Sequence, residues 1–180
     1  NINPVVASSI REWGTSGPLK LVANLPYDIA TPLLMNLLLD YPTVRSFCFT
    51  VQAEVGERIA APAGSKVYGP LSIIAQNLCV VEQVARLGPG SFWPRPQVDS
   101  VMLRLDRLDH PAIATEYAKR FAEFVHGVFE HRRKTLRAAL AYVVDEPQRD
   151  RICAIVDSKL RPEQIDPLQW AKLFHLLPSG

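Results

Sequence analysis

The sequence predicts an α/β fold, in which the second half of a doubly wound, Rossmann-like sheet precedes a small all-helical domain. Segments rich in β-forming residues alternate with segments of helical pattern up to about Leu108, which is typical of βαβ units. The last two predicted strands follow each other closely, which indicates an antiparallel edge. Beyond His110 strand signals vanish and apolar residues recur at helical spacing. We therefore expect two domains, 1–108 and 109–180.

Each element of the first domain is predicted from its own local pattern. The short apolar run 19–23 (LKLVA) indicates a buried strand. Thr31 followed by Pro32 is typical of a helix start, with an N-cap and then proline at the first helical position. That helix should run over 32–40, because Tyr41-Pro42 ends it. The remaining predicted elements, in chain order, are a strand at 44–51, a helix at 53–60, a buried helix at 71–80, a strand at 81–87, a rigid proline-rich loop at 88–97 and a strand at 99–108.

The second domain is predicted to be helical throughout. Asp166 before Pro167 indicates the start of its last helix, with an acidic N-cap and proline at the first helical position. The residues that indicate helices by their spacing are Tyr117, Phe121, Phe124, Val125 and Val128, then Leu136, Leu140 and Val143, and finally Trp170, Leu173 and Leu176.

Composition excludes several classes of protein. Hydrophobic residues make up 48% of the 180, yet no apolar stretch approaches the length of a membrane span. The net charge of +2 says little about partners. Cys48, Cys79 and Cys153 are isolated in apolar surroundings, a spacing that fits neither a zinc site nor a disulfide framework and suits a reducing cytoplasm. We expect no metal. The opening Asn1-Ile2-Asn3-Pro4 lacks an initiator methionine, so we expect a fragment of a longer protein.

The tetrad Asn24-Leu25-Pro26-Tyr27 carries the strongest functional signal, because ligands collect where the strands of an open α/β sheet end. An exocyclic amine on a planar base is a poor nucleophile, since its lone pair is delocalised into the ring. The Asn24 side-chain oxygen and the Leu25 carbonyl could accept its two hydrogens and draw the nitrogen towards a tetrahedral geometry. Pro26 offers no competing N–H, and Tyr27 offers a flat stacking face. The tetrad therefore predicts alkylation of a base amine, although an ordinary turn uses the same residue types.

Four strings occur in the same order and spacing as in one known family: NLPYDIATPLL, VQAEVGERIAAPAGSKVYGPLSIIAQ, FWPRPQVDSVMLRL and HRRKTLRAAL. Over almost its whole length the chain resembles the KsgA-type ribosomal RNA adenine dimethyltransferases. The resemblance implies a class I methyltransferase sheet and a C-terminal helical domain. It also implies that S-adenosylmethionine is the donor for N6,N6-dimethylation of two adjacent adenosines near the 3′ end of small-subunit (16S) rRNA. The implied partner is the precursor of the 30S ribosomal subunit, in the cytoplasm, for a monomeric enzyme that needs no membrane.

The resemblance also assigns roles to particular residues. Asn24, Leu25, Pro26 and Tyr27 would hold the target adenine, with Asn24 also next to the donor. Phe92 matches the second aromatic residue of the family, which closes over the flipped base from the other side. Stacking worth about 1–3 kcal/mol per base is of the size needed to offset unstacking the target. An alternative is that Phe92 and the adjacent Trp93 only anchor their loop to the sheet.

The chain departs from the family pattern in two respects. Asp28 replaces the usual Asn, Ala30 the usual Ser, Ala53 the usual Lys and Pro70 the usual Arg, so two positive charges are lost. The family's glycine-rich donor loop is also absent, since Gly88-Pro89-Gly90 leads into a proline-rich loop rather than a helix. We expect this chain to hold the base-recognition half of an active site with little to bind the donor.

The run His131-Arg132-Arg133-Lys134, with Arg137, is predicted to place several cations on one helix, with Arg133 and Arg137 on the same face. The high density of positive charge favours contact with RNA phosphates by Arg132, Arg133, Lys134 and Arg137. The alternative is that the run is only a solvent-exposed charged face. Two other functions stay open. One is a large-subunit rRNA adenine methyltransferase of the antibiotic-resistance type, which shares the tetrad. The other is a non-catalytic nucleic-acid-binding relative, such as the mitochondrial transcription factors built on this fold.

Overall fold

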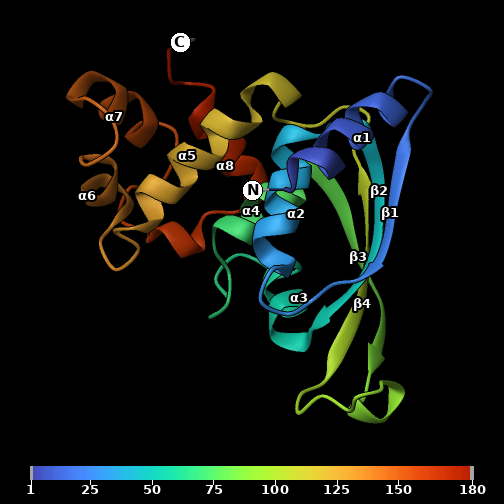
Figure 1. Ribbon diagram of the computed structural model, residues 1–180. Helices are drawn as coiled ribbons and strands as arrows, with labels where there is room; N and C mark the ends of the chain where they lie inside the picture. The colour runs from blue at the N-terminus through green and yellow to red at the C-terminus, as the bar shows by residue number, and fades with distance from the viewer. Residues whose placement is uncertain (1, 179–180) are drawn as a thin grey trace. The chain divides into compact units, whose positions relative to one another are not determined.

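The computed structural model describes residues 2–178, which form two compact units (Figure 1). The first unit takes in the chain up to Ala60 together with Leu78–Pro111, and the second takes in Ala61–Asn77 together with the chain from Ala112 onward. The sequence-based boundary differs from this division in the segment 61–77, which it gave to the first domain. Within the second unit the Tyr68 hydroxyl donates to the Ile165 carbonyl (2.7 Å), which ties this segment to the end of the chain. The organisation into two domains stays a prediction.

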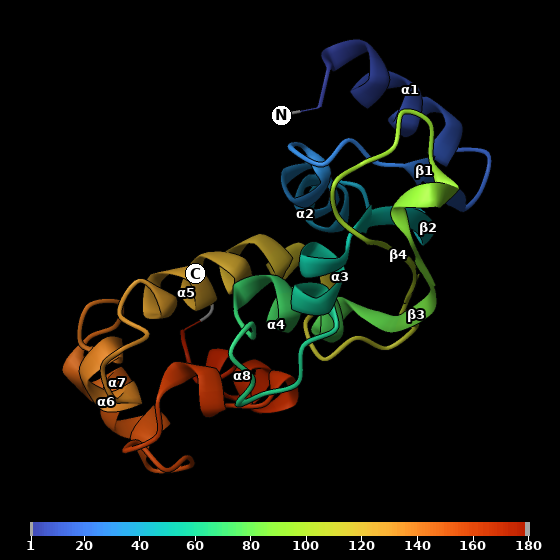
Figure 2. The same cartoon turned by 90° about the horizontal axis from the view of Figure 1, so that it is seen from below.

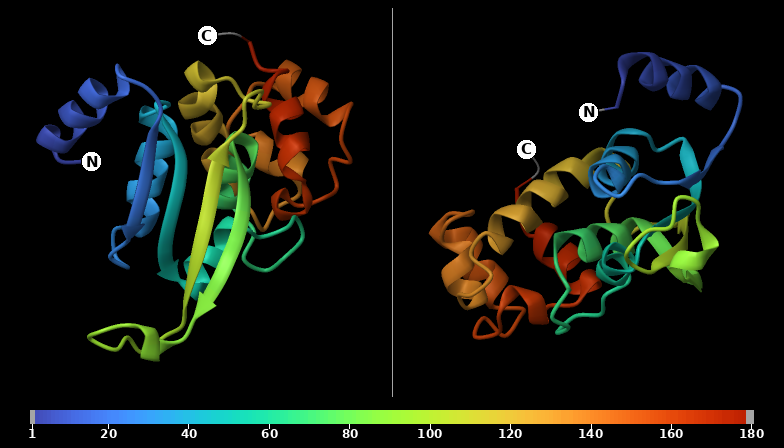
Figure 3. Two further views of the ribbon diagram at one scale, coloured as in Figure 1. Left: turned by 90° about the vertical axis from the view of Figure 1, so that its right-hand side faces the viewer. Right: turned by 60° about the horizontal axis from the view of Figure 1, so that its bottom comes forward.

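A four-stranded sheet forms the first unit, in the order β1-β2-β4-β3 (Figure 3, left). Its strands are β1 (Leu19–Asn24), β2 (Val44–Gln52), β3 (Cys79–Leu87) and β4 (Ser100–Arg107). β1 pairs parallel with β2, whereas β4 runs antiparallel to both of its neighbours. The antiparallel strand is therefore not the edge that the sequence predicted. It lies between β2 and β3, because its fully buried row of Val101, Leu103 and Leu105 requires a central position.

The prediction that β1 is a buried strand is wrong. Its residues alternate between half-buried and exposed positions, and the side chain of Val22 is 79% exposed. Among the described strands, β1 pairs with β2 alone. A continuous apolar run does not distinguish such an edge strand from a central one.

Three helices belong to the first unit: α1 (Pro4–Gly14), α2 (Ala30–Asp40) and α3 (Ala53–Ile59). The sequence analysis missed α1, although Asn3 before Pro4 is a cap signal, and the Asn3 side chain does accept from the Val5 N–H (2.9 Å). α2 starts at Ala30 with Ile29 as its N-cap, so Thr31 lies inside the first turn and does not cap the helix as predicted. α2 and α3 lie behind the sheet in Figure 3, left.

Arg107, at the end of β4, fixes the end of α2. The last carbonyls of a helix have no donor within the helix, and a buried helix end needs one. The Arg107 guanidinium donates to the carbonyls of Leu37 (3.0 Å) and Leu38 (2.9 Å), and its Nε donates to the Val44 carbonyl (2.8 Å). Burial lowers the pKa of Arg107 from its ordinary value. The guanidinium therefore joins the last turn of α2 to the start of β2.

The second unit is helical, as predicted, and Figure 2 shows its helices from below. An aromatic cluster forms its core, in which the rings of Phe124 and Trp170 meet edge to face with centroids 5.9 Å apart. Asp166 caps the last helix as the sequence indicated, accepting from the Gln169 N–H (2.9 Å). No helix within residues 2–178 is long and apolar enough to cross a membrane. The α-helices are α4 (Pro70–Leu78), α5 (Ala118–Phe129), α6 (Leu136–Leu140), α7 (Glu146–Cys153) and α8 (Pro167–Phe174).

Gly56 marks the closest approach of α3 to the sheet and yields a prediction about stability. A Cβ at Gly56 would lie 2.1 Å from Cγ2 of Val101, far inside van der Waals contact. Gly56→Ala should therefore lower the free energy of unfolding by about 1–3 kcal/mol through overpacking. Helix propensity alone predicts the opposite sign, a gain of about 1 kcal/mol. Urea denaturation measures the difference.

Two variants serve as controls for that measurement. Gly88→Ala places its Cβ where nothing lies within 4 Å, so its stability should stay close to that of the parent protein. Val101→Ala removes the clashing methyl group, so Gly56→Ala should cost less in that background than in the parent. A Gly56→Ala protein as stable as the parent would contradict the packing of α3 on β4.

Candidate functional site

The ends of three strands lie together at one end of the sheet. Parallel pairing aligns Asn24 of β1 with Thr50 of β2, and antiparallel pairing aligns Gln52 of β2 with Ser100 of β4. The carboxyl ends of β1 and β2 therefore lie beside the amino end of β4. The segment that follows β1 and the loop that precedes β4 consequently share this end of the sheet.

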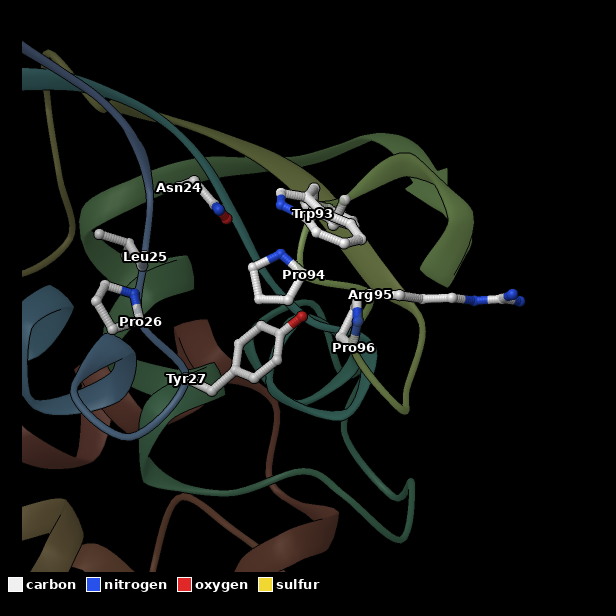
Figure 4. Close-up of a pocket in the computed structure, with 9 residues that line it drawn as sticks. Asn24, Leu25, Pro26, Tyr27, Trp93, Pro94, Arg95 and Pro96 are labelled. Carbon is white, nitrogen blue, oxygen red and sulfur yellow. The ribbon is translucent and has the colours of Figure 1, made fainter.

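A hollow of about 390 Å³ lies at this end of the sheet (Figure 4). Its size is within the range of small-molecule sites, and rings with a few polar atoms are the usual lining for a planar ligand. The structure thus brings together all five residues that the sequence analysis proposed as catalytic. The lining consists of the tetrad Asn24, Leu25, Pro26 and Tyr27 with Phe92, Trp93, Pro94, Arg95 and Pro96.

Thr50 orients the side chain of Asn24. The Thr50 hydroxyl donates to the Asn24 side-chain oxygen, and the Leu25 N–H donates to the Thr50 carbonyl (3.1 Å). A carbonyl oxygen has two lone pairs, so the Asn24 oxygen keeps one for a ligand. None of residues 2–178 donates to the Leu25 carbonyl, while the Leu25 side chain is buried and fixes the backbone. Two acceptors are therefore available at the hollow. The sequence analysis missed Thr50, because its role depends on the pairing of β1 with β2, which aligns it with Asn24.

Ser100 orients Tyr27. A hydrogen bond of 3.0 Å joins their hydroxyl groups, and Ser100 is only 1% exposed. A buried hydroxyl needs a partner, so this bond holds the half-buried Tyr27 ring in place. Ser100 was also missed, although a serine that opens an apolar strand (SVMLRL) is a recognisable signal.

The loop between β3 and β4 is held at its base. Asp99 forms an ion pair with Arg86 (3.0 Å), and the Asp99 carbonyl accepts from the Ala53 N–H (2.9 Å). Phe92 is half-buried, whereas the side chain of Trp93 is 95% exposed. Trp93 therefore does not anchor the loop to the sheet, which was the alternative role considered for it. Arg86 also lies 3.5 Å from Glu57 of α3.

The sequence analysis predicted that the basic residues lie on one helix, and this prediction is wrong. The residues 131–134 lie in a turn, because Thr135 caps a new helix by accepting from the Ala138 N–H (3.4 Å). Arg137 is on that new helix and pairs with Asp150 (2.8 Å), whose hydrogen bond and charge raise the pKa of Arg137. Arg132 and Arg133 form no ion pair within residues 2–178. Arg132 and Arg133 are therefore available to a ligand, whereas the Lys134 ammonium lies 5.5 Å from the centroid of the Tyr142 ring, in a cation–π contact.

The described residues do not form a glycine-rich loop at either strand-to-helix junction of the first unit. The residues 25–29 join β1 to α2 without a glycine, and Gln52 leads directly into α3. The described residues thus offer acceptors and aromatic rings at the hollow, but no glycine-rich loop that leads into a helix.

Comparison with known proteins adds independent evidence. The sequence model of the family described as "Ribosomal RNA adenine dimethylase" matches residues 8–178. The chain is 38% identical over 163 residues to the "Ribosomal RNA small subunit methyltransferase A" of Nocardia farcinica, covering 88% of this chain and 56% of that protein. It is 40% identical over 159 residues to the protein of the same name from Pseudomonas aeruginosa, covering 88% and 59%. The chain therefore spans a little more than half the length of these relatives.

Solved structures share the fold. A dimethyladenosine transferase from Plasmodium falciparum superposes with a TM-score of 0.71 at 23% identity, covering 86% of this chain and 65% of that one. The 23S rRNA methyltransferase ErmE gives a TM-score of 0.68 at 23% identity, covering 98% and 80%. With sequence identity of 38–40% to the relatives and a family match over residues 8–178, the chain belongs to the ribosomal RNA adenine dimethylase family.

Proposed function

We propose that this chain supplies the adenine-recognition part of an rRNA adenine-N6 dimethyltransferase. The proposed reaction is N6,N6-dimethylation of two adjacent adenosines near the 3′ end of small-subunit rRNA, in the precursor of the 30S ribosomal subunit. The observation that carries the proposal is the hollow in which the tetrad of residues 24–27 lies together with Phe92. The name of the two bacterial relatives supports a small-subunit substrate. We further propose that the protein acts as a monomer in the cytoplasm.

The hollow suits an adenine that has been taken out of its stack. Tyr27, held by Ser100, offers one stacking face, and Phe92 offers the second. The Asn24 side-chain oxygen and the Leu25 carbonyl accept the two hydrogens of the amine and favour a localised lone pair on N6. The methylated amine is positively charged and acidic, so water can take its proton. The lining accordingly needs no general base, and it contains no carboxylate or histidine.

S-adenosylmethionine is the proposed methyl donor, on the basis of family membership. The described residues do not fit it beyond Asn24, since they lack the glycine-rich loop. The recognition chemistry is therefore derived from this chain's own acceptors and rings.

The exposed turn that contains Arg132, Arg133 and Lys134 is proposed to contact RNA phosphates. Backbone contacts position an RNA without reading its bases, so this turn would supply affinity and the hollow would supply selectivity. Arg137 was included in this role by the sequence analysis. Its charge is already paired with Asp150, so we expect a smaller contribution from it.

A large-subunit rRNA substrate is the second candidate, because the fold is also that of ErmE. A sequence identity of 23%, however, supports only a shared fold. The strings YGPLS and FWPRPQVDS fit the small-subunit group better. A non-catalytic nucleic-acid-binding role is disfavoured by the intact tetrad, whose Asn24 and Tyr27 are both oriented by hydrogen bonds at the hollow.

Asn24→Ala in the full-length protein should lower the rate of methyl transfer to small-subunit rRNA by about 100-fold or more, as loss of one aligned polar group at a reacting centre does elsewhere. RNA affinity should change by less than about twofold, because phosphate contacts dominate it. Single-turnover kinetics and filter binding measure the two quantities. Asn36→Ala, on α2, is the control and should leave both unchanged. An Asn24→Ala enzyme with most of its turnover would remove Asn24 from the mechanism.

The isolated 180-residue chain should bind S-adenosylmethionine only weakly, because it has no glycine-rich loop. Isothermal calorimetry with the free donor measures this directly. The expected result is no saturable heat at micromolar concentrations. A dissociation constant in the micromolar range would instead show that other residues of this chain hold the donor.

Neutralising Arg132, Arg133 and Lys134 together should weaken binding to small-subunit rRNA. The salt dependence should also fall, by about one unit of slope in log affinity against log salt for each phosphate that is no longer neutralised. The adenosines that become methylated should not change, because phosphate contacts carry no base information. Arg137→Gln is the matched comparison and should have a smaller effect on the slope. Unchanged affinity and slope in the triple variant would identify the turn as a solvated surface only.

A further inference from the structure

Trp93 presents an unpaired aromatic surface at the rim of the hollow. The residue is 95% exposed, against 60% for Trp13 and none for the buried Trp170. Large aromatic side chains are usually buried over most of their area, so an indole left in water beside a candidate base site has a surface to offer a ligand. No described residue stacks on it or bonds its N–H.

Trp93 is separate from the ring that faces the target base. The backbone at Phe92 is extended (φ −129°, ψ 151°), and successive side chains of an extended backbone point to opposite sides. Phe92 is accordingly half-buried, while Trp93 is exposed. In Figure 4 the Pro94 ring is drawn between the Trp93 and Tyr27 rings, all three of which line the hollow.

The loop is well suited to present such a surface. Pro94 and Pro96 flank Arg95 and restrict the backbone, and Asp99 is tied to Arg86 at the base of the loop. A loop that is already ordered loses little conformational entropy when it binds a ligand.

Arg95 supplies a charge that fits the same ligand. Its side chain is exposed and extends away from the hollow in Figure 4. It forms no ion pair within residues 2–178. An unpaired guanidinium next to an exposed indole matches the two recognisable parts of a nucleotide, its phosphate and the flat face of its base.

We propose that Trp93 and Arg95 form a second nucleotide subsite, in which the Trp93 indole stacks on the base next to the one held in the hollow and Arg95 contacts a phosphate of the same strand. This inference rests on the proposed function, and it adds that the substrate is read as single-stranded RNA with two unstacked neighbouring bases. Stacking is tolerant of sequence, so the subsite strengthens binding whichever base the neighbour is.

Two short RNA probes test this proposal. The first carries two neighbouring adenines in an otherwise abasic strand, and the second carries one adenine in the same strand. Trp93→Ala should weaken binding of the two-base probe by about 5- to 150-fold, whereas Trp93→Phe should retain most of the affinity. Trp93→Ala should leave the one-base probe unaffected. Trp13→Ala, another exposed tryptophan, is the matched control and should change neither.

Fluorescence gives an independent readout. In a Trp13→Phe background the emission comes from Trp93 and the buried Trp170, and the two-base probe should quench the Trp93 part. Arg95→Gln should weaken both probes and lower the salt slope by about 0.7, the value for one phosphate of a single strand. Equal weakening of both probes in Trp93→Ala would place the indole in the first base site and overturn the proposal, as would unchanged binding of both.

Tyr27→Ala separates this inference from the proposed function. If the proposed base pocket is correct, Tyr27→Ala should weaken the one-base probe. If Tyr27→Ala has no effect while Trp93→Ala still weakens the two-base probe, the base pocket is wrong but the Trp93 surface does bind a base.

Discussion

The pairing of β4 between β2 and β3 is the constraint on which the rest of the first unit depends. Its buried residues Val101, Leu103 and Leu105 require a central position, and Gly56 lets α3 pack directly against Val101. With β4 in this register, the loop before it lies where β1 and β2 end. The hollow is a consequence of this arrangement, because its two halves come from chain segments about 70 residues apart.

The site combines rigid acceptors with aromatic rings that come from a loop. Thr50 and Ser100, both on strands, fix the side chains of Asn24 and Tyr27 through hydroxyl groups that are almost fully buried. In the proposed function, these acceptors are aligned before the base arrives, which would raise the reactivity of its amine without a general base. Phe92, in contrast, comes from a loop whose base is held by Asp99 and whose tip is exposed.

Many local features of this molecule were predictable from sequence, although α1 and the N-cap of α2 were not, and the features that depend on strand order were not predictable either. The tetrad, the cap at Asp166 and most helices and strands follow from patterns a few residues long. The central place of β4 and the roles of Thr50 and Ser100 depend on strand order and register, which no single segment encodes. The turn at residues 131–134 was misassigned as helix, although Thr135 is a good N-cap and gave the signal for a new start.

In the proposed function an adenine binds between the tetrad of residues 24–27 and Phe92. The most direct measurement is an NMR study of the protein with an adenine-containing RNA, in which nuclear Overhauser effects between adenine ring protons and assigned side chains are recorded. The structure predicts effects from the adenine H2 and H8 protons to the rings of Tyr27 and Phe92. Effects from these protons only to residues of the helical unit would contradict it.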